Sequence, residues 1–179
     1  MEPEKRELPR YLVPKIIFLI VSMSFPFGWA KYAARQNGLK ADKIKVIKVY
    51  DGDTILVQTR EKKQNVRLYG IDAPEVKSRH MSKGQPYGNQ STRLLAELVE
   101  GKIVKLERKA TDKYGRLLAV VFLNGQDICL EMVKGGLAWR NSTRYRSAQE
   151  KARSRYLGLW ADPDPVRPRK WRKLYHRKD

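Results

Sequence analysis

Five short strand patterns between residues 43 and 123 leave few folds open to this chain. They cover residues 43–50, 54–59, 65–72, 102–110 and 116–123, and an Asp-Gly-Asp bend separates the first two. Alternating apolar residues are typical of half-buried strands, and Asp-Gly is a strong hairpin signal. Short, curved strands of this kind favour a small, mostly antiparallel barrel.

Three helix patterns accompany the strands. Residues 91–99 form an amphipathic pattern between the third and fourth strands, and residues 126–136 and 146–160 follow the fifth strand. Glycines stop the first two helices, as is usual at helix C-termini. Runs of strands followed by helices predict an α+β domain rather than alternating βαβ units.

The charge of the chain indicates a polyanionic partner. The 179 residues include 38 Lys and Arg against 19 Asp and Glu, which gives a formal net charge of +19. Such an excess favours nucleic acid, an anionic membrane surface or an acidic polysaccharide. The single cysteine, Cys129, excludes an internal disulfide and is expected in the core. With only His80 and His176 beside it, the usual zinc sites are excluded.

The chain divides into four segments. Residues 1–30 carry basic residues followed by an apolar stretch, which predicts either a cleaved signal peptide or a retained membrane anchor, as an N-terminal hydrophobic helix. Both alternatives imply export, so the protein is expected to be secreted or membrane-anchored outside the cytoplasm. Residues 31–42 read as a linker, residues 43–162 as the folded domain, and residues 163–179 as a basic, Pro-rich tail.

The rare acids are concentrated at strand ends. Asp51 and Asp53 flank the first bend, and Asp72 and Glu75 lie in "GIDAPE" at the end of the third strand pattern. If the first three strands form a meander, Asp53 lies next to Asp72, and two close carboxylates repel unless a cation separates them. One such acid would be read as a turn residue. Four in two short motifs predict a site for Ca²⁺, with Mg²⁺ or Mn²⁺ as alternatives.

Two arginines extend this prediction to a substrate. Arg67 precedes Asp72 on the third strand pattern, and Arg116 follows "TDKYG". A metal held by acids and flanked by guanidinium groups suits a phosphodiester, because both stabilise negative charge that develops on the phosphate.

These motifs resemble a known family. "VYDGDTILV", "VRLYGIDAPE", "TDKYGRLLAVVF", "GGLAW" and "GLW" occur here in the order found in the staphylococcal nuclease (thermonuclease, micrococcal nuclease) family. The resemblance covers residues 43–160 and implies a five-stranded OB-fold barrel with three α-helices. It also implies Ca²⁺-dependent endonuclease cleavage of DNA and RNA that leaves 3′-phosphates.

The resemblance also implies roles for individual residues. Asp53, Asp72 and the backbone carbonyl of Ala73 would bind Ca²⁺. Glu75 resembles the glutamate that positions or deprotonates the attacking water, while Arg67 and Arg116 resemble the arginines that bind the phosphate.

Four further residues complete the implied site. Lys113 and Tyr114 match residues that hold a terminal nucleotide phosphate, and Asp51 matches an acid near the metal that does not bind it directly. The family's tyrosine pair after "GLAW" is replaced here by "RNSTRY", which leaves Tyr145 as a candidate for stacking on a base.

Two questions stay open at this point. A nuclease-like OB barrel that only binds nucleic acid is the alternative function, although the chain retains all five catalytic and carboxylate-ligand side chains just named. The tail is expected to be disordered without a ligand and to act as a tether, either to nucleic acid or to anionic lipid. The protein is expected to be a monomer.

Overall fold

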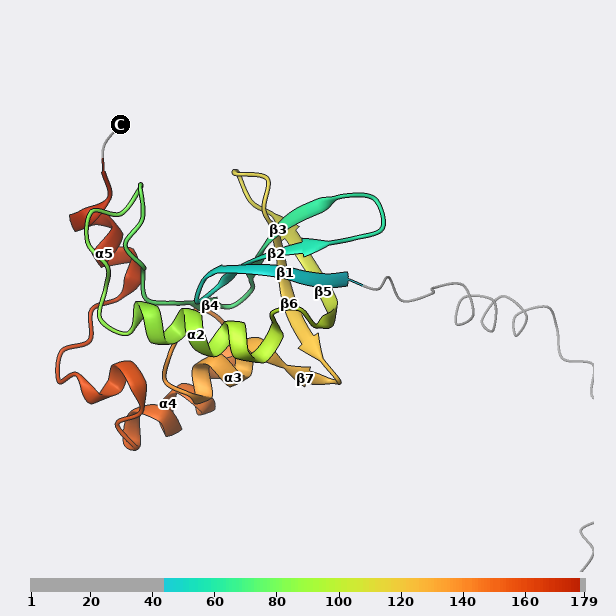
Figure 1. Ribbon diagram of the computed structural model, residues 1–179. Helices are drawn as coiled ribbons and strands as arrows, with labels where there is room; N and C mark the ends of the chain where they lie inside the picture. Colours follow the sequence, from blue (N-terminus) through green and yellow to red (C-terminus); the bar gives the residue numbers. More distant parts are fainter. Residues whose placement is uncertain (1–43, 178–179) are drawn as a thin grey trace, which may run out of the picture. The chain divides into compact units, whose positions relative to one another are not determined.

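A closed five-stranded barrel forms the centre of the structure. The computed structural model describes residues 44–177, and the predicted N-terminal signal or anchor and the linker lie outside them. The barrel strands are β1 (Ile44–Asp51), β2 (Thr54–Gln58), β3 (Lys63–Leu68), β5 (Ile103–Thr111) and β6 (Leu117–Leu123). Neighbours pair antiparallel in the order β3-β2-β1-β5-β6, and a parallel pairing of β3 with β6 closes the barrel (Figure 1). The predicted α+β OB-fold is confirmed.

The third predicted strand is shorter than expected. Residues 65–72 were predicted as one strand, but β3 ends at Leu68 and β4 (Ile71–Asp72) pairs instead with β8 (Trp139–Arg140). Gly70 has a φ of 83°, which breaks the extended backbone, and its carbonyl accepts hydrogen bonds from the N–H groups of Asn141 and Ser142. The break takes β4, which carries Asp72, out of the barrel sheet and into a two-stranded sheet with β8. A third short strand, β7 (Gln126–Asp127), extends the edge of β6.

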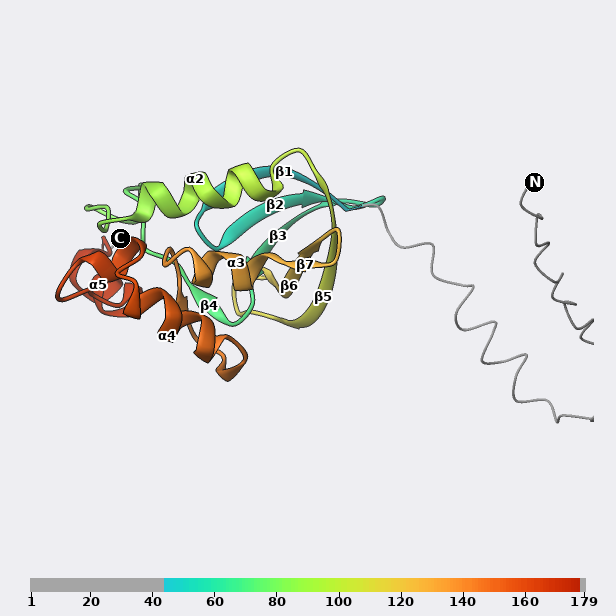
Figure 2. The same cartoon turned by 90° about the horizontal axis from the view of Figure 1, so that it is seen from below.

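Four α-helices and two short 3₁₀ turns occur in residues 44–177. The helices are α2 (Gly88–Val99), α3 (Ile128–Lys134), α4 (Arg146–Ser154) and α5 (Pro168–Tyr175), and the 3₁₀ turns are η1 (Thr143–Tyr145) and η2 (Gly158–Ala161). The helix predicted over residues 146–160 therefore stops at Ser154, because Tyr156 and Gly158 both have positive φ. Helix α2 runs alongside β1 in both views (Figures 1 and 2).

The core lies between the barrel and helices α2 and α3. Val46, Ile55 and Leu68 of the barrel are fully buried together with Leu95 of α2 and Met132 of α3. Burial of each large apolar side chain stabilises the fold by about 1.5–3 kcal/mol. Cys129 is buried in the same core, as predicted, and its burial raises the pKa of the thiol to about 12.

The expectation of a disordered tail is wrong. Pro168 opens α5 at a position where its missing N–H costs no hydrogen bond, and Trp171 is buried against the domain. The indole Nε1–H of Trp171 donates to the carbonyl of Lys83 at 3.0 Å. The free energy of burying this indole offsets the entropy of ordering the tail. Within residues 44–177, no helix combines the length and apolarity that crossing a membrane requires.

The proposed base-stacking role of Tyr145 is also wrong for this fold. The residue is only 1% exposed, so its ring presents no face to a nucleotide. Its hydroxyl donates to the Asp127 carboxylate at 3.1 Å, and burial is the main cause that raises the pKa of the phenol. Asp127 in turn caps α3 by accepting from the N–H of Leu130. Tyr145 thus ties η1 to the start of α3.

We predict that Tyr145→Phe lowers the free energy of unfolding by about 1–3 kcal/mol, because it leaves a buried carboxylate without one donor. Urea unfolding monitored by circular dichroism measures the difference. Tyr156→Phe is the matched control, since Tyr156 is 74% exposed. Equal stability of the two variants would contradict the structural role given to Tyr145.

Candidate active site

The site begins at the bend between β1 and β2. Asp51 closes this bend, because its Oδ1 accepts from the N–H of Asp53 at 3.0 Å. Gly52 is required by close packing rather than by its φ angle: a Cβ there would lie 1.9 Å from Ser91 Oγ and 2.7 Å from the Ala73 Cβ. The bend is therefore pressed against α2 and against the segment after β4, which fixes the position of Asp53.

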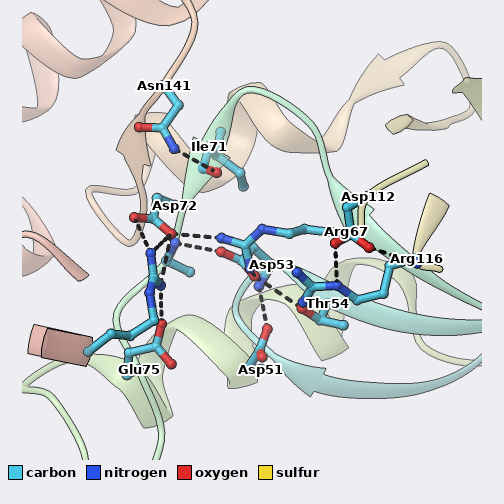
Figure 3. A network of polar contacts seen from close by, with 12 residues as sticks. Asp51, Asp53, Thr54, Arg67, Ile71, Asp72, Glu75, Asp112, Arg116 and Asn141 are labelled. Carbon is cyan, nitrogen blue, oxygen red and sulfur yellow. Dashed lines mark hydrogen bonds and ion pairs between the residues drawn. The ribbon is translucent and has the colours of Figure 1, made fainter. Parts of the chain in front are cut away.

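Asp53 and Asp72 are joined by one guanidinium group. Arg67 Nη1 lies 2.5 Å from Asp53 Oδ1, and Arg67 Nη2 lies 2.7 Å from Asp72 Oδ1. Asp53 is 2% exposed, and its second oxygen accepts from the N–H of Ala73 at 2.8 Å. Figure 3 shows both carboxylates turned toward Arg67. The meander of β1, β2 and β3 thus brings together the two acids that the sequence suggested would be neighbours.

Glu75 lies beside this pair on the segment that follows β4. Its backbone is held in place, because the carbonyl accepts from the N–H of Gln85 at 2.8 Å and the N–H donates to Gln85 Oε1 at 3.3 Å. A Cβ on Gly88, the first residue of α2, would lie 2.3 Å from that same carbonyl. The start of α2 therefore packs directly on Glu75 and leaves its side chain facing the site.

A residue from the C-terminal helix completes the cluster. Arg172 of α5 contacts both oxygens of Asp72 at 3.2–3.3 Å, and its Nη1 donates to Glu75 Oε1. Arg172 was not among the residues predicted from the sequence, because the tail was expected to be disordered. A usable signal was present: Pro168 followed by Trp171 and Tyr175, four residues apart, is typical of a short helix with one apolar face.

The electrostatics of the cluster are unbalanced. Asp51, Asp53, Asp72 and Glu75 face the guanidinium groups of Arg67 and Arg172. Burial and then repulsion from Asp51 raise the pKa of Asp53 to about 7, and Arg67 and the Ala73 N–H offset this only in part. Burial also raises the pKa of Glu75, although Arg172 opposes that rise. Burial is the main cause of both shifts, and repulsion between the neighbouring carboxylates adds to it.

A divalent cation fits this cluster. Four carboxylates against two guanidinium groups leave two negative charges uncompensated when all are ionised, and the donors are hard oxygens, which Ca²⁺ and Mg²⁺ prefer. Among residues 44–177, no three His, Cys, Asp or Glu side chains gather closely enough to hold a metal by themselves. A cation at Asp53 and Asp72 would therefore need additional oxygens, such as the carbonyl of buried Ala73 and water.

The remaining predicted residues lie on the β5–β6 hairpin. Arg67 pairs in register with Leu118, and Arg116 precedes that residue by two positions, so Arg116 and Arg67 project from the same face of the barrel. Arg116 Nε donates to Asp112 Oδ2 at 2.8 Å (Figure 3). Lys113 and Tyr114 are exposed at the hairpin tip, where the ammonium of Lys113 lies 5.0 Å from the Tyr114 ring centre. Within residues 44–177, no hydrogen bond or ion pair joins these hairpin residues to Asp53, Asp72 or Glu75.

Comparison with known proteins supplies the family. The profile described as "Staphylococcal nuclease homologue" matches residues 65–162. A Haemophilus influenzae protein named an uncharacterized endonuclease is 44% identical over 135 residues, covering 72% of each chain. An Escherichia coli O157:H7 protein with the same name is 36% identical over 94% of this chain and 99% of its own. A Shigella flexneri protein named micrococcal nuclease is 34% identical over 90% of both chains. The chain therefore belongs to the staphylococcal nuclease family.

Proposed function

We propose that this protein is a Ca²⁺-dependent endonuclease of the thermonuclease type, which hydrolyses DNA and RNA without regard to the sugar. The observation that carries the proposal is the joining of Asp53 and Asp72 by Arg67, with Glu75 beside them. This combines acids that suit a metal, a base for water and a donor for phosphate in one cluster, whose acids Asp53 and Asp72 are buried. The names of the similar proteins from H. influenzae, E. coli and S. flexneri, endonuclease and micrococcal nuclease, support the nuclease part of this proposal.

The reaction adds water across one P–O bond. Glu75 would accept a proton from water as the water oxygen attacks phosphorus, and its raised pKa makes it a better base than an exposed carboxylate. Breaking the bond to O5′ yields a 3′-phosphate, and the departing O5′ takes up a proton to become a hydroxyl group.

Arg67 and Arg116 would hold the phosphate. Their guanidinium groups project from one face of the barrel and can each donate two hydrogen bonds to non-bridging oxygens. Negative charge builds on those oxygens in the transition state, so preorganised donors lower the barrier more than they strengthen substrate binding. Lys113 and Tyr114, exposed at the tip of the hairpin, would contact a neighbouring phosphate of the chain.

Asp53, Asp72 and the Ala73 carbonyl would hold the Ca²⁺. The bound ion supplies Lewis-acid chemistry, namely polarisation of the phosphate and of water. Asp51 would contribute charge from a distance, because its Oδ1 is already used by the N–H of Asp53. Its repulsion of Asp53 nevertheless favours a nearby cation.

Metal dependence gives the first test of this activity. We expect the full-length protein to convert supercoiled plasmid to nicked and linear forms with Ca²⁺, to stop in excess chelator, and to recover when Ca²⁺ is restored. Mg²⁺ should serve far less well, because a site of two carboxylates, a carbonyl and water is too flexible for its strict octahedral geometry. Binding of plasmid without cleavage under all conditions would instead favour the nucleic-acid-binding alternative. Cleavage that persists in chelator would contradict the metal assignment.

Substitution of Arg67 tests the phosphate-binding assignment. Arg67→Lys should lower kcat roughly 100-fold, as removal of one preorganised donor does in other hydrolases, since lysine keeps the charge but loses the two-pronged geometry. Initial rates on a fluorescent oligonucleotide measure the effect, and circular dichroism checks folding. Arg93→Lys makes the same change at an exposed position on α2 and should cleave normally. Near-normal cleavage by Arg67→Lys would exclude phosphate binding by the two Nη groups of the Arg67 guanidinium.

A further inference from the structure

The C-terminal helix α5 is built into the domain beside the acids of the site. Its N-terminal side is held where Gln85 Nε2 donates to the carbonyl of Val166 at 2.5 Å. Its C-terminal side is held by Ser82, whose N–H and hydroxyl both donate to the carbonyl of Tyr175, at 3.0 and 2.9 Å. Buried Trp171 lies between these points. Figures 1 and 2 both show α5 beside the loop that joins β4 to α2.

This docking fixes one side chain of α5 over the site. Arg172 directly follows the buried Trp171, so the packing of the indole determines where the guanidinium can reach. Both Nη atoms contact Asp72, and Nη1 also donates to Glu75. Lys173, the next residue, is exposed and forms no ion pair with Asp72 or Glu75. The contact is therefore particular to Arg172 and does not follow from the general basicity of the helix.

Arg172 occupies the oxygens that a metal would need. Asp72 Oδ1 accepts from both Arg67 and Arg172, and Asp72 Oδ2 accepts from Arg172 at 3.2 Å. A cation bound by Asp72 must take over at least one of these oxygens. The metal ion must also bind close to the positively charged guanidinium of Arg172, and the repulsion between the two charges weakens its binding.

We propose that Arg172 is a positioning residue of the active site, which holds Asp72 and Glu75 while no metal is bound and competes with the metal for Asp72. The inference rests on the proposed metal-dependent function. Helix α5 thereby sets how tightly the site binds a divalent cation. A substitution that removes the charge of Arg172 should therefore have two opposite effects. It should lower the stability of the metal-free protein and raise the affinity of the site for the metal.

Calorimetric titration of the full-length protein with CaCl₂ tests the competition. Arg172→Gln should bind Ca²⁺ with a Kd roughly tenfold lower than wild type, within the range usual for coupling between two binding events. Arg172→Lys, which keeps the charge, should recover most of the wild-type Kd. Lys173→Gln removes the same charge from the adjacent exposed position and should leave the Kd unchanged.

Thermal unfolding separates this role from simple structural support. Arg172→Gln should lower the Tm in chelator, because Asp72 and Glu75 lose their shared counter-ion, and Ca²⁺ should raise its Tm more than it raises that of wild type. A residue that only holds α5 in place would lower the Tm equally with and without Ca²⁺. Equal lowering, or a Kd for Arg172→Gln equal to or higher than wild type, would overturn the proposal.

Plasmid cleavage by the same wild-type preparation distinguishes failure of this inference from failure of the proposed function. If wild type cleaves plasmid but neither it nor Arg172→Gln binds Ca²⁺, the nuclease activity stands and the role of Arg172 is excluded. If wild type fails to cleave but Arg172→Gln binds Ca²⁺ more tightly, the competition stands and the proposed activity is excluded.

Discussion

The guanidinium group of Arg67 holds together the two acids around which the site is built. Asp53 comes from the end of the β1–β2 bend and Asp72 from β4, and each accepts a hydrogen bond from one Nη atom of the Arg67 guanidinium. Without the Arg67 guanidinium, two buried carboxylates would face each other across a region of low dielectric, which is strongly unfavourable. Removal of one partner from such a buried pair typically costs about 3–5 kcal/mol. The geometry of the active site and the stability of this end of the barrel therefore depend on the same contact.

Close backbone packing fixes the positions of the segments that carry Asp53, Asp72 and Glu75. A Cβ on Gly52 would collide with Ser91, and one on Gly88 would collide with the Glu75 carbonyl, so the bend, α2 and the segment after β4 approach one another as closely as glycine allows. The φ of Gly70 then diverts the chain from β3 into β4 and turns Asp72 toward the bend. Three glycines thus set the relative positions of acids that belong to different elements.

The C-terminal segment adds a second counter-ion to the same acids. Arg172 reaches Asp72 across 100 positions of sequence, and it does so because Trp171 anchors α5 on the loop before α2. The ammonium group of Lys83, on that loop, lies 5.8 Å from the ring centre of Trp171 and 5.4 Å from that of Tyr175. These cation–π contacts add to the attachment of α5 to the loop. The tail is thus part of the domain, and its positive charge acts on the site at short range.

The sequence by itself determined the local features of this protein. Strand periodicity, the Asp-Gly bend and the glycine-stopped helices predicted the barrel and α2, because these signals depend on neighbouring residues alone. The ordered motifs also pointed to Asp53, Arg67, Asp72 and Glu75. Only the tertiary structure decided that Tyr145 is buried and that Arg172 contacts the acids, since both depend on packing between distant segments. Tyr145 lies in the core because Asp127 offers its hydroxyl a buried partner, and α5 is ordered because the loop before α2 covers Trp171.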